Sequence, residues 1–141
     1  MKPSGYSGTP LAKKLGIKEN FRVKLVHAPG YYLDLFEDFP SDVKIIKSEK
    51  DKIDFIHYFC KKSEALIKDI PSLKKELQPN GMIWVSWCKK SAGIPTDVTE
   101  DVIRAVALKN GLVDIKVCAV DEVWSGLKLV IPVKDRKKNF K

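Results

Sequence analysis

The segment NGMIWVSWCKKSAGIPTDVTEDV, residues 80–102, predicts a turn, a buried strand, a polar loop and the start of a helix. Its MIWVSW portion is almost wholly apolar, which is typical of a strand that is covered on both faces. Thr99 followed by Glu100 and Asp101 suits a first helical turn, because a hydroxyl can cap that turn and acidic groups favour the positive end of the helix dipole. A strand, a loop and a helix in this order indicate an α/β protein.

The rest of the chain continues the alternation of strands and helices. KIDFIHYFC, residues 52–60, predicts a second central strand, and a helix capped by Ser63 is expected to be kinked or divided at Pro71 and stopped by QPNG at residues 78–81. The last two predicted strands are close enough along the chain to form an antiparallel hairpin around DEVWSG. The remaining predicted elements are a short helix, a strand, a second short helix, a brief strand and these two final strands, at residues 9–16, 20–28, 31–39, 43–47, 112–120 and 127–133.

This order of elements predicts an α/β fold with three layers, in which a mostly parallel sheet has helices on both faces and is closed by a C-terminal antiparallel hairpin. Ligands of such sheets bind beyond the carboxyl ends of the strands, so residues 87–96 are expected at the ligand-binding edge. A single domain is expected over residues 1–133, followed by a basic tail at 134–141 that is expected to be disordered.

The positive charge of the chain predicts anionic partners. The net charge is +8, and the last eight residues, KDRKKNFK, account for half of it. This excess favours a small anionic molecule or a weak, nonspecific association with nucleic acid, and the alternative is a solvated, mildly basic surface. The residues expected to contact nucleic acid are Lys13, Lys14, Lys18, Arg22 and those of the basic tail.

Other features of the composition predict a cytoplasmic protein with no membrane partner. No apolar run approaches the roughly 20 residues that a membrane helix needs. The N-terminal residues lack the apolar core of a secretion signal. Cys60, Cys88 and Cys118 lie in or beside apolar runs, where reduced cysteines behave as small hydrophobic side chains.

Two parts of the sequence resemble known families. LKKELQPNGMIWVSW, residues 73–87, together with the closing hairpin, resembles the helix, turn and strands of the Rossmann-like fold of S-adenosylmethionine-dependent methyltransferases. GYSGTPLAKKLGIK, residues 5–18, together with residues 84–130, resembles a bacterial domain family of unknown function. The first resemblance implies S-adenosylmethionine as a cofactor, and the second implies a cytoplasmic location without a particular reaction.

The cofactor site that the methyltransferase resemblance implies has a glycine-rich turn after the first strand and an acidic residue after the second. Here the turn is VHAPGYY, residues 26–32, with Gly30 as its single glycine. Lys47 stands where the acidic residue is expected, and Glu49 or Asp51 could take that role only if the second strand were longer.

These departures predict a small-ligand-binding or regulatory domain on a methyltransferase-like scaffold, with a degenerate cofactor turn. The alternative is an active S-adenosylmethionine-dependent methyltransferase with an atypical cofactor pocket, lined by Gly30, Tyr31 and Trp87.

Several side chains near the expected ligand-binding edge suit such a role. Trp87 could stack on a planar ligand or pack under the loop, while Lys89 and Lys90 could hold a phosphate or carboxylate or be solvated. His27 could be a general base or make a structural hydrogen bond, and Asp121 could line the pocket or belong to a solvated turn. The candidate ligand-binding residues are His27, Gly30, Tyr31, Trp87, Lys89, Lys90, Thr96, Asp121 and Trp124.

No metal site is expected. His57 and Cys60 have the spacing of some zinc ligands, but side chains three positions apart on a strand point to opposite faces. His57 lies in the middle of an apolar strand, and a structural role is expected for it.

Overall fold

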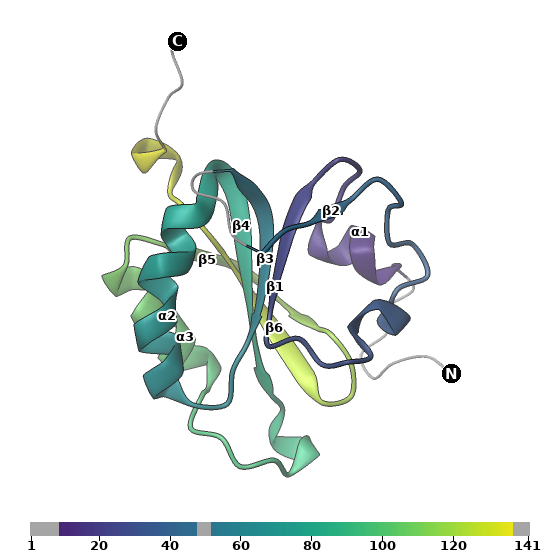
Figure 1. Cartoon of the computed structure of the whole chain (residues 1–141). Coiled ribbons are helices and arrows are strands. Elements are labelled where there is room, and N and C mark those ends of the chain that lie inside the picture. The colour runs from purple at the N-terminus through teal and green to yellow at the C-terminus, as the bar shows by residue number, and fades with distance from the viewer. Residues whose placement is uncertain (1–8, 48–51, 137–141) are drawn as a thin grey trace.

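The computed structural model describes residues 9–47 and 52–136. Within them a six-stranded sheet forms, with the strand order β2-β1-β3-β4-β6-β5 (Figure 1). β2, β1, β3 and β4 are parallel neighbours, and β6 runs antiparallel to both β4 and β5, which confirms the predicted sheet and its closing hairpin. The strands are β1 (Arg22–Val26), β2 (Lys44–Ile45), β3 (Ile53–Phe59), β4 (Leu77–Cys88), β5 (Val113–Ala119) and β6 (Trp124–Val130).

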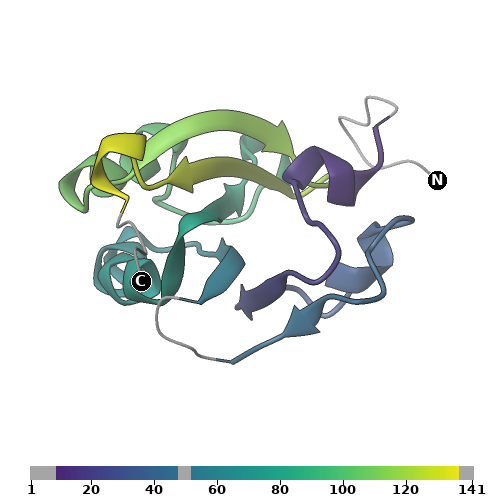
Figure 2. The same cartoon turned by 90° about the horizontal axis from the view of Figure 1, so that it is seen from above.

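Helices cover both faces of this sheet. α2 (Ser63–Glu76) and α3 (Glu100–Lys109) lie on one face, and α1 (Leu11–Leu15) and the 3-10 helix η1 (Tyr32–Leu35) lie on the other (Figures 1 and 2). Each face has its own buried apolar cluster. The three-layer α/β class is therefore confirmed. Two further 3-10 turns are η2 (Lys90–Ala92) and η3 (Val133–Asp135).

The two strands predicted to be central are buried as expected. β3 lies between β1 and β4, and all but one of its residues are buried. On β4, Trp84 is buried in the cluster under α1 and η1, while Trp87 is half-buried against the cluster under α2 and α3. Residues three apart on a strand point to opposite faces, and these two tryptophans follow that rule.

α2 is one continuous helix, so of the two outcomes predicted at Pro71, a kink or a division, the division is wrong. Proline removes one hydrogen bond from a helix interior. Leu66, Ile70 and Leu73 nevertheless lie buried on both sides of Pro71, and their shared apolar stripe packs onto the sheet. Tertiary packing supplies most of the stability of a helix in a protein, and here it outweighs the local cost of the proline.

QPNG does not form a separate turn, because its residues belong to β4, which begins at Leu77. The pairing of β3 with β4 is irregular here, since Ile53 lies opposite Leu77 and Phe55 opposite Met82. A Cβ atom on Gly81 would lie 2.9 Å from the carbonyl oxygen of Ile53 and 2.7 Å from Cδ1 of Leu77. The glycine is therefore required for the close approach of the two strands.

The helix caps differ in part from the prediction. Thr99 caps α3 as expected, because its hydroxyl accepts a hydrogen bond from the amide of Val102 at 3.2 Å. Ser63 does not cap α2; it is the first residue of that helix. The cap comes instead from Asp97, whose carboxylate accepts hydrogen bonds from the amide of Ser63 at 2.7 Å and from its hydroxyl at 2.8 Å. These bonds lower the pKa of Asp97.

The start of the predicted basic tail is folded against the domain. Val133–Asp135 forms η3, and the guanidinium of Arg136 donates to the carbonyl oxygen of Ile131 at 2.8 Å. The rest of the tail, residues 137–141, lies outside the described residues. Among the helices that the structure describes, none is both long and apolar enough to span a membrane.

Candidate functional site

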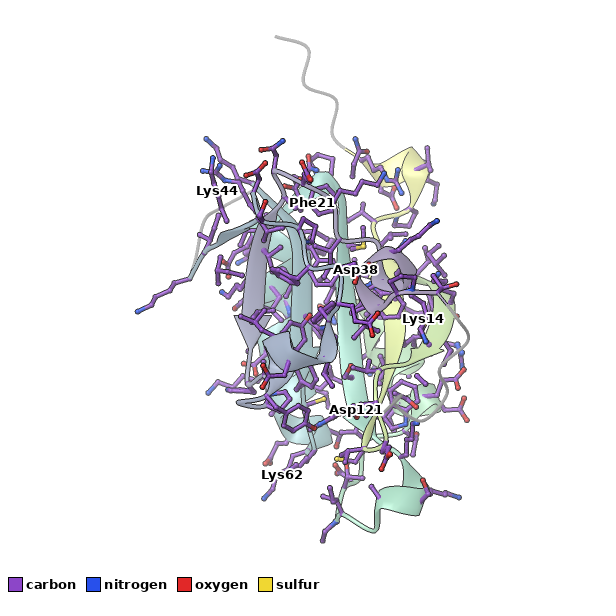
Figure 3. All side chains as sticks on the ribbon, turned by 90° about the vertical axis from the view of Figure 1, so that its right-hand side faces the viewer. Lys14, Phe21, Asp38, Lys44, Lys62 and Asp121 are labelled. Carbon is purple, nitrogen blue, oxygen red and sulfur yellow. The ribbon has the colours of Figure 1, made fainter. Side chains whose placement is uncertain are left out.

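A cavity of about 410 Å³ opens at the carboxyl ends of β1 and β3, and we call it the strand-end cavity. Because β6 is antiparallel to β4, its first residue lies at the same edge of the sheet as the last residues of the parallel strands. Figure 3 shows Lys62 and Asp121 toward this end of the molecule and Lys44 and Phe21 toward the other. The residues that line the strand-end cavity are His27, Pro29, Phe59, Cys60, Lys61, Lys62, Ala65 and Trp124.

Aromatic and basic side chains give this cavity two kinds of wall. Phe59 and Trp124 meet edge to face, with ring centroids 5.0 Å apart. Lys61 and Lys62 follow the end of β3, and both side chains are exposed. Cys60 adds an apolar surface, because its burial, aided by the nearby Asp69 carboxylate, raises the pKa of its thiol to about 12. The cavity therefore suits a ligand with an apolar body and an anionic group.

The turn after β1 holds a non-glycine residue in a conformation that favours glycine. His27 has φ 57°, whereas Gly30 is not among the described glycines with positive φ. A Cβ atom on Gly30 would meet no other atom within 4 Å, and Gly30 does not line the strand-end cavity. The left-handed conformation costs an L-residue about 1–2 kcal/mol, and such strain is concentrated at functional sites.

Replacing His27 by glycine is expected to raise the free energy of unfolding by about 1 kcal/mol, because glycine adopts this conformation without the steric cost. Urea denaturation monitored by tryptophan fluorescence measures the change. Ala28→Gly is the matched control, since Ala28 has no positive φ and gains nothing from a glycine. A His27→Gly variant that is no more stable than the original protein would show that His27 is not strained.

Asp121 is a buried structural group, not a member of a solvated turn. Its carboxylate accepts hydrogen bonds from the amides of Val123 at 2.8 Å and of Trp124 at 2.7 Å, and it shares a hydrogen bond with the hydroxyl of Tyr31. Burial, together with this carboxylate, raises the pKa of Tyr31 to about 12. Asp121 thus fixes the hairpin loop beside the turn after β1 and holds Trp124, which begins β6, at the cavity wall.

Two of the candidate residues in the loop after β4 lie in different surroundings: Thr96 lines a cavity, and Lys89 contacts the hairpin loop. Thr96 lines a second, more open cavity of about 580 Å³, and its hydroxyl donates to the carbonyl oxygen of Lys61 at 2.7 Å. Lys61 and Lys62 line both cavities, which are therefore neighbours. Lys89 donates its amide to Val123 at 2.8 Å, which ties β4 to the hairpin loop. The second cavity is lined by Lys61, Lys62, Ser63, Glu64, Ile67, Pro95, Thr96 and Asp97.

The structure brings together only some of the predicted site residues. His27 and Trp124 line the strand-end cavity, while Tyr31 and Asp121 support its wall. Thr96 lines the second cavity. Four other candidates line neither cavity: Gly30, Trp87, Lys89 and Lys90.

Sequence reasoning missed the end of β3, where Phe59, Cys60, Lys61 and Lys62 lie. The signal was present in YFCKK, residues 58–62, because two lysines directly follow a strand that was expected to be central. The rule that ligands bind beyond the carboxyl ends of parallel strands applies to β3 as it does to β4.

A buried polar chain adjoins Phe59, one of the residues that line the strand-end cavity. The Tyr32 hydroxyl is 2.9 Å from Nδ1 of His57, and Nε2 of His57 is 2.7 Å from the Ser86 hydroxyl. Phe59 stacks on the His57 ring, with centroids 4.3 Å apart. Burial lowers the pKa of His57 to about 3, so the ring is neutral at pH 7. The chain joins η1, β3 and β4.

The methyltransferase resemblance implies a cofactor site with an acidic residue after the second strand. No described residue that lines the strand-end cavity carries a carboxylate, which could hold ribose hydroxyls. Lys47, where an acidic residue was expected, is exposed after β2, and Glu49 and Asp51 lie outside the described residues. Within the described ranges, no three His, Cys, Asp or Glu side chains gather closely enough to hold a metal ion.

Comparisons with known proteins support the fold. No model of a protein family matches the chain and no curated protein matches it, so the resemblance to the bacterial family stays a prediction. Many solved structures are similar, and several of them are methyltransferases.

A SAM-dependent methyltransferase from Aquifex aeolicus superposes with a TM-score of 0.65 at 18% identity, over 85% of this chain and 87% of that chain. The ribosomal protein L11 methylase from Lactobacillus delbrueckii subsp. bulgaricus gives 0.55 at 14% identity, over 85% and 74%. The B. subtilis tRNA methyltransferase TrmK gives 0.54 at 11% identity, over 94% and 69%. The chain has a methyltransferase-like Rossmann fold.

Proposed function

We propose that this protein is a small-ligand-binding or regulatory domain, whose ligand has a flat apolar body and an anionic group and occupies the strand-end cavity. The observation that supports this proposal most directly is the pairing of an aromatic wall, Phe59 and Trp124, with Lys61 and Lys62 in one cavity. The cavity also lies where open parallel sheets bind their ligands.

The placement of the charged groups favours binding of an anion by side chains. A helix N-terminus that follows a parallel strand can bind a phosphate, but the first turn of α2 already has a carboxylate on it, from Asp97. Lys61 and Lys62 remain exposed beside that turn and form no ion pair among the described residues. They are the groups that would hold the anionic part of the ligand.

A second candidate function is methyl transfer from S-adenosylmethionine. The similarity of the fold to the Aquifex aeolicus methyltransferase, and the position of the cavity beside the turn after β1, support it. The aromatic wall would suit an adenine ring. The positive charges of Lys61 and Lys62 oppose a sulfonium cation, which is why this candidate comes second.

Calorimetric titration with four probes separates the two candidates. Phenyl phosphate and adenosine monophosphate each combine an aromatic ring with an anion, and we expect both to bind more tightly than S-adenosylmethionine or its demethylated product. A Lys61→Gln/Lys62→Gln variant is expected to bind phenyl phosphate about tenfold more weakly, because charge-assisted hydrogen bonds are lost.

The control variant is Lys68→Gln/Lys109→Gln, which makes the same charge change at exposed positions on α2 and α3, outside both cavities. It is expected to bind like the original protein. Absence of binding by both aromatic anions would contradict the proposal. Tight binding of S-adenosylmethionine and of its demethylated product would instead favour the methyltransferase, and a methyl acceptor would then be sought.

A further inference from the structure

Lys116 and Lys128 lie directly opposite each other on β5 and β6. Side chains at such positions have Cβ atoms about 4.5–5.5 Å apart, and like charges there destabilise the strand pair. Burial, followed by the charges of Lys116 and Lys18, lowers the pKa of Lys128. Three lysines from distant parts of the chain therefore converge on one place.

The contacts of Trp84 explain how Lys18 reaches the two strands. Trp84 on β4 lies opposite Lys128 on β6, and its indole N–H donates to the carbonyl oxygen of Leu15 at 2.8 Å. Leu15 ends α1, and Lys18 follows it three residues later. The end of α1 is thus held against the part of the sheet that carries Lys128.

No ion pair among the described residues balances this positive charge. Lys18, Lys116 and Lys128 form no ion pair there, since the described ion pairs involve only Lys24 and Arg104 as cations. None of the three lines either cavity. A protein that keeps like charges together without a counter-ion loses stability, and such an arrangement is characteristic of a binding site for anions.

We propose that Lys18, Lys116 and Lys128, the lysine cluster, bind the phosphate backbone of a nucleic acid. Because the cluster lies on an open surface, it suits an extended polyanion better than a small molecule that a cavity would enclose. Lys14 on α1 adds a basic side chain on the face of the molecule that Figure 3 shows.

The surroundings of the cluster do not suit a lipid surface. Membrane-surface binding combines basic and apolar side chains on one face. Val117, which is 47% exposed, pairs with Leu127, whose side chain belongs to the core under α2 and α3. The exposed side chain of Val117 therefore points away from Lys116 and Lys128, which lie on the side of Trp84.

Fluorescence anisotropy with a fluorescein-labelled, 20-nucleotide single-stranded RNA tests this proposal. We expect a Lys18→Gln/Lys116→Gln variant to bind roughly 20-fold more weakly at 0.1 M salt. Each phosphate contact on a single strand contributes about 0.7 to the slope of log affinity against log salt concentration, so the affinity of this variant should also depend less steeply on salt. Lys128 is left intact because it is half-buried.

Two control variants carry the same change of charge. Lys68→Gln/Lys109→Gln removes charges from α2 and α3 and is expected to bind RNA almost as well as the original protein. Lys137→Gln/Lys138→Gln removes them from the tail and is expected to lose less affinity than the cluster variant. The proposal is overturned if the original protein does not bind RNA, or if either control loses as much affinity as the cluster variant. It is also overturned if vesicles containing phosphatidylglycerol bind the protein and RNA does not.

Discussion

Trp84→Ala is expected to lower the free energy of unfolding by about 3–5 kcal/mol, the range for removing a large aromatic side chain from a core. Trp84 is fully buried and is among the largest fully buried side chains of the described residues. A Cβ atom on Gly126 would lie 3.0 Å from Cε3 of Trp84, so the indole fills the space that this glycine leaves. Because the neighbouring strands cannot close such a gap, the loss should be near the top of the range.

Urea denaturation measures this loss, and Trp84→Phe separates its two causes. Phenylalanine keeps much of the buried volume but cannot donate to Leu15. We expect Trp84→Phe to lose less stability than Trp84→Ala and to speed hydrogen exchange of the α1 amides, because a five-residue helix does not persist without tertiary contacts. A Trp84→Ala variant that loses less than about 1 kcal/mol would contradict the packing described for this residue.

Acidification from pH 7.5 to pH 5 is expected to lower the free energy of unfolding by about 2 kcal/mol through His57 alone. The pKa of His57 is about 3 in the folded protein, whereas an unfolded histidine has a pKa of about 6.5. Between these values the unfolded chain binds a proton that the folded protein does not, so stability falls as the pH falls below 6.5. The fall continues until the pH reaches the folded pKa.

Chemical denaturation at several pH values, with His57→Gln beside the original protein, isolates this contribution. Glutamine does not titrate, so the stability of His57→Gln should change by about 2 kcal/mol less between pH 7.5 and pH 5. Asp97 does not interfere in this range, because its pKa is lowered from 3.8 and its contribution is lost only at a lower pH. Equal pH dependence in the two proteins would show that His57 gains its proton without unfolding.

Much of the fold could be predicted from the sequence, because the deciding patterns are local. The apolar runs at residues 52–60 and 82–87 predicted the central strands β3 and β4, and the short connection DEVWSG predicted the closing hairpin. The errors arose where distant contacts decide the outcome. Pro71 stays within one helix because its neighbours pack onto the sheet, and α2 is capped by Asp97 rather than by Ser63.

The candidate site was harder to predict than the fold, because its geometry depends on which strand ends meet. Trp124 was placed in a loop, but it begins β6 and lines the cavity because β6 is antiparallel. Two roles were open for Trp87, stacking on a planar ligand or packing under the loop, and it packs against the apolar cluster under α2 and α3, since its position on β4 fixes the face on which it lies. The strained conformation of His27 has no local signature in the sequence.

The cap that Asp97 places on α2 also orders the events of folding. Ser63 and Asp97 are 34 residues apart, so their contact closes a loop that includes all of β4. Local turns form before such loops close, because closing a loop costs chain entropy, and this cost is offset only by contacts that form afterwards. The first turn of α2, which directly follows the two lysines shared by the two cavities, is therefore completed together with the loop after β4. A chain in which this contact has not formed would have no finished second cavity, because Ser63 and Asp97 both line it.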